Sequence, residues 1–243
     1  MRVPSGLSTS TIGVTFHPIF MQELRFKADV VPDDPDQQVA STILLMCRYA
    51  QEDSTSTEIQ AEAQGILQAN YGASKKELTC KVWEWVQRKI QFLRDERTGE
   101  SLEGFLAQTY ADAPIVEVLI RPRDMALMEN VRVGDCDDYA MYAAALLLAL
   151  GIPAAYVTVA GDKRNPGRFT HVYVAAYPDG ERVVVDASHG PSCGWEATQR
   201  LRLGARKKEW MIGASSGSDS GLGSCGVTLL MILAGALILA VCE

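Results

Sequence analysis

Apolar residues in the first part of the chain recur every three or four positions, the spacing of a helix with one buried face. From Gln38 onward this pattern is carried by Val39, Ile43, Leu44 and Cys47. A second helix is predicted over Glu58–Asn70. A third is predicted to begin after Ser74, because Glu77 stands three residues later in the arrangement of a capping box. Residues 1–73 are therefore expected to form an extension with helices.

Beyond Val131 one more helix is predicted, and strands follow it. A strongly apolar helix is predicted over Ala140–Leu150, preceded by the run Gly134-Asp135-Cys136 and ended by Gly151 and Pro153. A β-branched strand follows over Ala155–Val159. Two further strands, His171–Val174 and Arg182–Asp186, are joined by Pro178-Asp179-Gly180, which predicts a hairpin. Helices followed by a small antiparallel sheet indicate an α+β fold.

The end of the chain has a different composition. Gly213–Ser224 is rich in Gly and Ser, and Gly226–Cys242 carries no charge over a length close to the roughly 20 residues of a membrane span. We expect a main domain over residues 74–210, a linker over 211–224 and a hydrophobic, transmembrane tail over 225–243. The tail is interpreted as an anchor. The alternative is a helix buried in an oligomer or particle.

A compact basic run precedes this tail. It consists of Arg200, Arg202, Arg206, Lys207 and Lys208. One interpretation is a solvated helix face. The other is a juxtamembrane cluster that would keep the domain on the cytoplasmic side of a membrane.

Charge and cysteine usage exclude several classes of function. The chain has 23 basic and 30 acidic residues and a net charge of -7, so we expect no nucleic-acid partner. Met1–Phe20 has no apolar core of the kind a secretory signal needs. Six scattered cysteines form no CxxC pair, which argues against a zinc site and a disulfide framework. We therefore expect a reducing compartment, no cofactor and no metal.

Three residues carry candidate chemistry. Cys136 lies at a predicted helix start, where the helix dipole favours the thiolate, and an adjacent imidazolium would favour it further. His171 and Asp186 lie in the paired strands of the hairpin, so their side chains can meet across the ladder. A carboxylate on one ring nitrogen leaves the other for the thiol, which predicts a triad. Each residue alone is more often structural, and only their order and combination favour catalysis.

Two alternatives stay open: a rival pair of a thiol and an imidazole, and an effect of the acidic residues beside Cys136 on its thiolate. His189 and Cys193 lie close together in a Gly-, Pro- and Ser-rich stretch, where a second thiol pair is conceivable but would lack rigid support. Asp135, Asp137 and Asp138 around Cys136 would partly oppose a thiolate, and the alternative is that they cap the helix.

The sequence at this point resembles the transglutaminase-like branch of the papain-type cysteine proteases. The resemblance rests on the runs GDCDDYAMYAAALLLALGIPAAYV, THVYVAAY and VVVDAS and covers roughly Cys80–Trp195. The stretch that begins at Asp186 is similar to versions encoded in phages and prophages. The resemblance implies Cys136 as nucleophile, His171 as general acid and base, and Asp186 as the orienting carboxylate. It also implies a papain-like fold and no calcium.

The expected function is acyl transfer through a Cys thioester, chiefly hydrolysis of peptide or isopeptide bonds in a protein or peptide substrate, with transamidation as a variant. A non-catalytic structural or assembly protein of a phage virion is the alternative. A third hypothesis is membrane permeabilisation by the tail.

Overall fold

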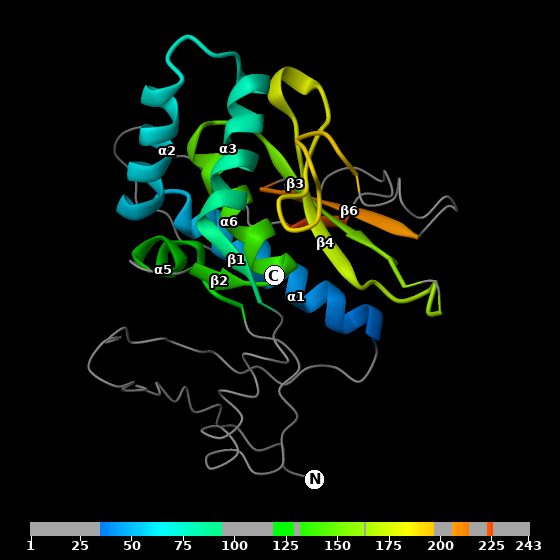
Figure 1. The fold of residues 1–243 in the computed structure, drawn as a ribbon. Coiled ribbons are helices and arrows are strands. Elements are labelled where there is room, and N and C mark those ends of the chain that lie inside the picture. The colour runs from blue at the N-terminus through cyan, green and yellow to red at the C-terminus, as the bar shows by residue number, and fades with distance from the viewer. Residues whose placement is uncertain are drawn as a thin grey trace, which may run out of the picture.

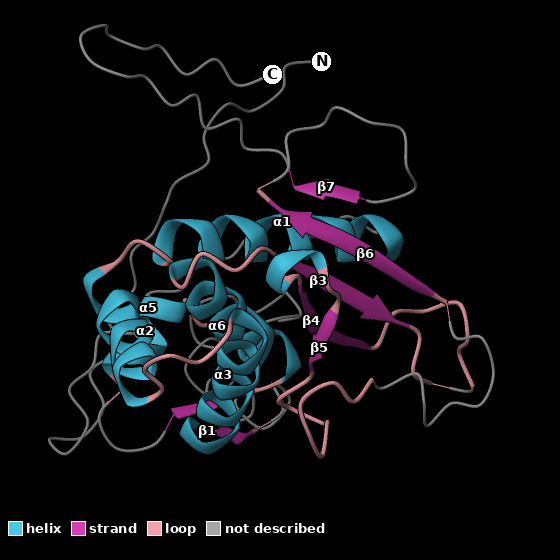
Figure 2. Cartoon of the chain, turned by 90° about the horizontal axis from the view of Figure 1, so that it is seen from above, coloured by secondary structure: helices cyan, strands magenta, loops and turns pink. Residues whose placement is uncertain are grey.

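The computed structural model describes residues 35–93, 119–128, 132–162, 164–196 and 206–213, and the backbone of 223–225. Its helices are α1 (Pro35–Asp53), α2 (Thr57–Ala69), α3 (Lys75–Lys89), α5 (Pro122–Leu127) and α6 (Cys136–Ala149). Its strands are β1 (Ile90–Phe92), β2 (Arg132–Gly134), β3 (Ala154–Val159), β4 (His171–Ala176), β5 (Val183–Val185), β6 (Lys207–Ile212) and β7 (Gly223–Cys225). The helices gather on one side of the larger sheet (Figures 1 and 2). An α+β fold is therefore confirmed.

α6 is the central helix, and its sequence explains why. It is apolar all round, and every residue from Asp137 to Leu147 is buried. α1, α2 and α3 pack around it, and their apolar faces join it in one core. Residues 35–73 thus share the core of α6 instead of forming a unit apart from it.

The predicted start of α3 is confirmed in detail. The Ser74 side chain accepts a hydrogen bond from the Glu77 backbone N–H, and the Glu77 carboxylate accepts one from the Ser74 N–H, so the capping box is complete. Val82 and Val86 are fully buried on the apolar face of the helix.

The larger sheet has the strand order β5-β4-β3-β6-β7. β3, β4 and β5 form an antiparallel meander, which confirms the hairpin predicted from the sequence. Its turn is the 3₁₀ element Pro178–Gly180, where Asp179 and Gly180 have φ of 50° and 85°. β6 pairs antiparallel with β3 and parallel with β7, so strands occupy both ends of the expected 211–224 linker.

The expectation that the cysteines are reduced is wrong for Cys47, Cys80 and Cys193. Cys80 and Cys193 form a disulfide between α3 and the stretch that follows β5, and Cys47 is disulfide-bonded as well. The two partners of the first bond are 113 residues apart in sequence. A pairing over that distance depends on how α3 packs, which no cysteine spacing shows.

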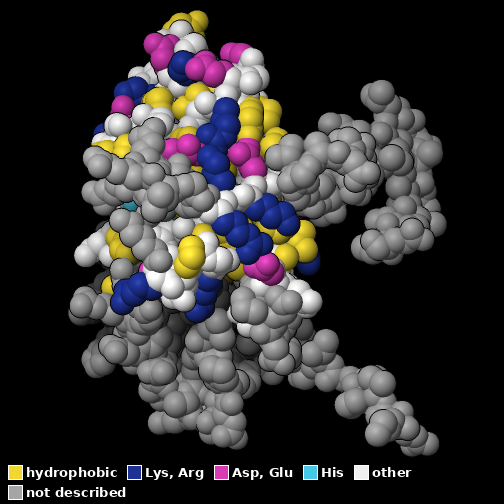
Figure 3. Space-filling view, turned by 90° about the vertical axis from the view of Figure 1, so that its right-hand side faces the viewer, with side chains coloured by type: hydrophobic (Ala, Val, Ile, Leu, Met, Phe, Trp, Pro, Cys, Tyr) yellow, Lys and Arg dark blue, Asp and Glu magenta, His cyan; other side chains and the backbone are white. Residues whose placement is uncertain are grey.

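Lys207 and Lys208 of the basic run lie in β6 and Arg206 directly precedes it, so the helix-face interpretation is wrong for these residues. Arg206 precedes β6 and pairs with Asp36 of α1 at 2.9 Å, while Lys207 lies 3.4 Å from Glu196. Figure 3 shows Lys and Arg side chains gathered on this face of the molecule, with carboxylates beside them. Arg200, Arg202 and the tail Gly226–Cys242 lie outside the described residues.

Among the helices that the structure describes, none combines the length and apolar character of a membrane span. The expected anchor stays a prediction.

Candidate active site

Cys136 is the first residue of α6, and aspartates on either side of it build the helix start. The Asp135 side chain accepts a hydrogen bond from the Asp137 N–H, and the Asp138 side chain accepts one from the Asp135 N–H. The Asp135 and Asp138 carboxylates therefore cap the helix, as the sequence allowed, whereas Oδ1 of Asp137 accepts a hydrogen bond from the Asp138 N–H. Cys136 itself is a thiol and is partly buried.

Gly134 is needed for this helix start. A Cβ at Gly134 would lie 2.6 Å from the Cβ of Asp138 and 2.6 Å from its Oδ2. The other Asp138 oxygen, Oδ1, accepts a hydrogen bond from the Ile120 N–H at 2.8 Å. Asp138 thus ties three segments together immediately beside Cys136, and only glycine leaves room for it.

His171 and Asp186 are brought together by the hairpin. If the β4–β5 register Val174↔Val185 is continued by one residue, Asp186 stands opposite Tyr173 and diagonally across from His171. His171 Nε2 lies 3.0 Å from Asp186 Oδ2. The imidazole is 11% exposed and the carboxylate 0%, so water competes little for this hydrogen bond. Nδ1 of His171 is then the nitrogen left for a thiol.

The Asp186 carboxylate is also held from its other side. Oδ1 accepts hydrogen bonds from Ser188 Oγ at 3.2 Å and from the His189 N–H at 3.1 Å. The Asp186 backbone carbonyl accepts from Trp83 Nε1 at 3.1 Å. These donors fix the carboxylate in one orientation, which is what an orienting residue requires.

A series of ring contacts links the start of α6 to His171. Tyr139, one turn after Cys136, has its ring centroid 6.1 Å from that of Phe92. Phe92 contacts His189 at 5.2 Å, and His189 contacts His171 edge-on at 4.5 Å. Burial raises the pKa of Tyr139 to about 12, so this phenol is neutral at ordinary pH. The rings therefore connect Tyr139 of α6 to His171 through Phe92 and His189.

The rival pair His189–Cys193 is wrong as a thiol pair, because Cys193 is bonded to Cys80. His189 is instead a neighbour of His171, a role that sequence reasoning missed. The contact of Trp83 with Asp186 was missed as well. Neither contact has a sequence signal, because each depends on how α3 and β5 pack.

Two groups in the described part of the chain could offer ligand atoms to a metal ion. One comprises His171, Asp186 and His189, and the other Asp135, Asp137 and Asp138, with ligand atoms within 4.8 Å of one another in each group. The first group contains the hydrogen-bonded pair described above, and the second caps α6. Hydrogen bonds within the protein thus already give each group a structural use.

Comparison with solved structures finds similar chains at low identity. They include a candidate cysteine protease from Cytophaga hutchinsonii (19% identity, TM-score 0.39, 69% of this chain and 52% of that chain) and a candidate protease from Parabacteroides distasonis (15%, 0.41, 75% and 30%). A third is a TGase (12%, 0.32, 79% and 44%). This chain spans about half or less of their length. No curated protein matches.

The family comparison is more direct. The model of the family described as "Transglutaminase-like domain" matches residues 62–193. The matched stretch runs from α2 to the disulfide-bonded Cys193 and includes Cys136, His171 and Asp186. The finer resemblance to phage-encoded versions stays a prediction. Since the match covers more than half of the 243 residues, the chain belongs to the transglutaminase-like domain family.

Proposed function

We propose that this protein transfers acyl groups through a thioester on Cys136, with His171 as general acid and base and Asp186 as the orienting carboxylate. The observation that carries the proposal is the buried hydrogen bond between His171 Nε2 and Asp186 Oδ2. It favours the tautomer with the proton on Nε2, so that Nδ1 can accept a proton from a thiol.

The first step is the formation of the nucleophile. Nδ1 of His171 takes the proton of Cys136, and the thiolate is stabilised by the imidazolium and by the positive end of α6. The thiolate attacks an amide carbonyl, and the carbonyl π electrons move onto its oxygen. The backbone N–H of Cys136, in the first turn of α6, is one donor for this oxyanion.

The second step releases the first product. The tetrahedral intermediate collapses to a thioester as the C–N bond breaks, and the imidazolium gives its proton to the leaving amine. Water then attacks the thioester, with His171 as base, and frees a carboxylic acid and the Cys136 thiol. An amine in place of water would give a new amide, which is transamidation.

The substrate class we propose is a peptide or isopeptide bond of a protein or peptide. Family membership supports a thiol-based chemistry of this general kind. The preference for hydrolysis over transamidation rests on the sequence resemblance alone. A direct comparison is release of dye from fluorescein-labelled casein against incorporation of dansylcadaverine into unlabelled casein.

The decisive test is alkylation of the full chain with iodoacetamide at graded pH, located by peptide mass spectrometry. The parent is compared with Cys136→Ala and His171→Ala. We expect Cys136 to react at pH 6 at least about tenfold faster than in His171→Ala, because an isolated thiol is mostly protonated there. Equal, slow alkylation in both chains would contradict the proposal and favour a non-catalytic structural protein.

A further inference from the structure

One face of α3 holds the stretch that follows β5. We call residues 186–196, which begin with Asp186, the Asp186 loop. Cys80, Trp83 and Gln87 are three and four residues apart, so they line up along α3. Cys80 is bonded to Cys193, and Gln87 Nε2 lies 3.4 Å from the Gly190 carbonyl. Together with the Trp83 indole, α3 contacts the loop at its start, middle and end.

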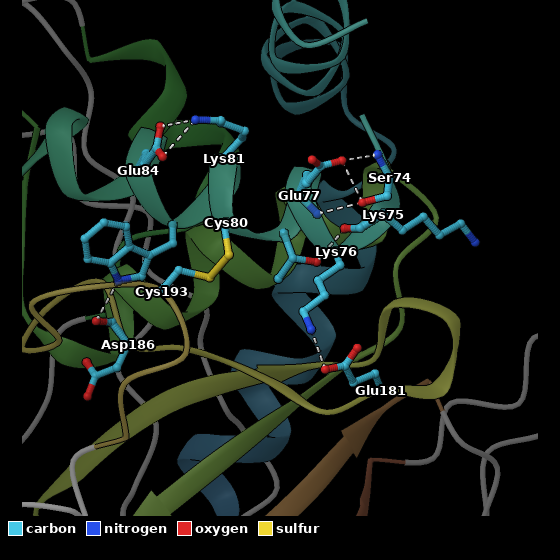
Figure 4. The surroundings of a disulfide bond; sticks show 12 residues. Ser74, Lys75, Lys76, Glu77, Cys80, Lys81, Glu84, Glu181, Asp186 and Cys193 are labelled. Atoms are coloured by element: carbon cyan, nitrogen blue, oxygen red, sulfur yellow. Dashed lines mark hydrogen bonds and ion pairs between the residues drawn. A yellow bond between two sulfur atoms is a disulfide. The ribbon is translucent and has the colours of Figure 1, made fainter. Parts of the chain in front are cut away.

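Figure 4 shows how two of these contacts converge. The disulfide and the indole N–H that reaches the Asp186 carbonyl leave the same side of α3 and meet the same loop. Trp83 is 8% exposed, so its hydrogen bond is shielded from water. The Asp186 carbonyl also accepts from the Gly190 N–H at 2.9 Å, which closes the turn that carries His189.

The position of Asp186 therefore has two supports. On one side it continues β5, whose pairing with β4 ends at Val185. On the other side the peptide is held from α3. A shift of about 1 Å would take the 3.0 Å contact with His171 beyond hydrogen-bonding range, and displacements of that size have large catalytic effects.

We propose that Trp83 and the Cys80–Cys193 disulfide are positioning groups for the His171–Asp186 pair. The effect of this positioning on catalysis rests on the proposed function. If that function holds, the active enzyme needs Cys136 as a thiol and Cys80–Cys193 as a disulfide at the same time. Activity has an optimum in reducing strength instead of rising steadily with it.

The loss at high reductant has a defined chemistry. A dithiol such as dithiothreitol passes two electrons and two protons to the two sulfurs, the S–S bond breaks, and the reductant leaves as its cyclic disulfide. Cys80 and Cys193 become thiols, and the end of the Asp186 loop is no longer tied to α3. Cys136 is unchanged by this reaction, since it is already a thiol.

The test uses the full chain with Cys80→Ser/Cys193→Ser and, separately, Trp83→Phe, which keeps the disulfide and a ring. The first readout is the low-field NMR resonance of the His171 Nε2–H proton, recorded on protein whose histidines are labelled with ¹⁵N. The resonance is assigned to His171 by its absence in His171→Gln. The second is the rate at which iodoacetamide alkylates Cys136 at pH 6. We expect the resonance to be lost or broadened and the rate to fall at least tenfold in both variants.

Ser74→Ala is the matched control. It removes the capping box of the same helix and touches no loop residue, so it should lower the thermal midpoint and leave both readouts at parent values. Parent-like resonance and alkylation in Trp83→Phe and in the serine pair would overturn the proposal. If the serine pair fails to fold, Trp83→Phe alone decides.

The two proposals fail in different ways. If the resonance depends on Trp83 and the disulfide but Cys136 is no more reactive than an isolated thiol, the positioning holds and the proposed function falls. If Cys136 is reactive and neither Trp83→Phe nor the serine pair lowers its alkylation rate, the proposed function stands and the positioning proposal is wrong.

Discussion

His171 Nε2 lies 3.0 Å from Asp186 Oδ2, although the two residues are 15 positions apart and on different strands. The contact follows from the antiparallel register of β4 and β5, and the burial of the carboxylate shields it from water. It decides which ring nitrogen carries the proton, and so which one can serve a thiol.

Asp186→Asn tests that relationship. Asparagine keeps the shape of aspartate and one acceptor oxygen, but its NH₂ group would face Nε2 and favour the tautomer with the proton on Nδ1. We expect casein hydrolysis to fall by roughly 10²–10⁴, the range for loss of general acid–base catalysis. Ser188→Ala, which removes one of three bonds to the carboxylate, should have a much smaller effect. Equal activities of parent and Asp186→Asn would contradict the assignment.

Gly134→Ala should destabilise the start of α6. The added Cβ would lie 2.6 Å from Asp138 Cβ, a contact that forces the cap and the backbone apart. We expect a loss of about 1–3 kcal/mol in the free energy of unfolding, measured by urea denaturation. Gly65→Ala is the control, because that position of α2 is exposed and has no atom within 4 Å of the added Cβ. Its expected effect is a gain of about 0.5–1 kcal/mol. Similar losses at the two positions would show that the Asp138 contact is unimportant.

Gly190→Ala should move the Asp186 peptide. Its Cβ would lie 2.4 Å from the Asp186 carbonyl oxygen, which accepts the Trp83 and Gly190 hydrogen bonds. We expect slower alkylation of Cys136 at pH 6, in the same direction as for Trp83→Phe. Gly167→Ala, at an exposed position with open space around it, should alkylate like the parent. A parent-like rate in Gly190→Ala would show that the turn can shift without consequence for the site.

Glu62→Gln should change how the free energy of unfolding depends on pH in the acidic range. Burial raises the pKa of Glu62, but hydrogen bonds from Arg132, Tyr142 and Trp85 outweigh it and hold the pKa below its ordinary value. The folded state therefore favours the carboxylate. This stability is fully present above the unfolded pKa of about 4.3 and is lost as the pH falls through the lower folded pKa.

The Glu62→Gln variant lacks that titration and leaves Arg132, 2.5 Å from Glu62 in the parent, without its counter-charge. We expect it to be less stable than the parent at pH 7 by about 3 kcal/mol, with the difference shrinking below about pH 4. Urea midpoints at pH 7, 5 and 3.5 measure this. Glu84→Gln, at an exposed ion pair with Lys81, should change stability by less than about 1 kcal/mol. A constant difference for Glu62→Gln across pH would contradict the assigned linkage.

Much of the fold could be predicted because its signals are local. The capping box at Ser74, the turn at Asp179-Gly180 and the start of α6 each depend on residues within four positions of one another. Helical and strand periodicities likewise need only neighbouring residues. These features follow from backbone geometry and short-range hydrogen bonds, whatever the rest of the chain does.

The arrangement around Asp186 was not predictable in the same way. Trp83 reaches Asp186 over 103 positions, and Cys80 reaches Cys193 over 113. Such contacts depend on the angle at which α3 packs against α6 and β5. Spacing in a single sequence holds no information on that angle, so Cys80 and Cys193 were wrongly expected to be reduced.

By itself, the sequence determined the helices α1, α2, α3 and α6, the meander of β3, β4 and β5 with its hairpin of His171 and Asp186, and the cap in front of Cys136. Only the tertiary structure decided that His189 packs on His171, that Trp83 holds the Asp186 peptide, and that α3 is bonded to the Asp186 loop. The physical reason is range: secondary structure is encoded by nearest neighbours, whereas an active site is assembled by packing between segments far apart in the chain.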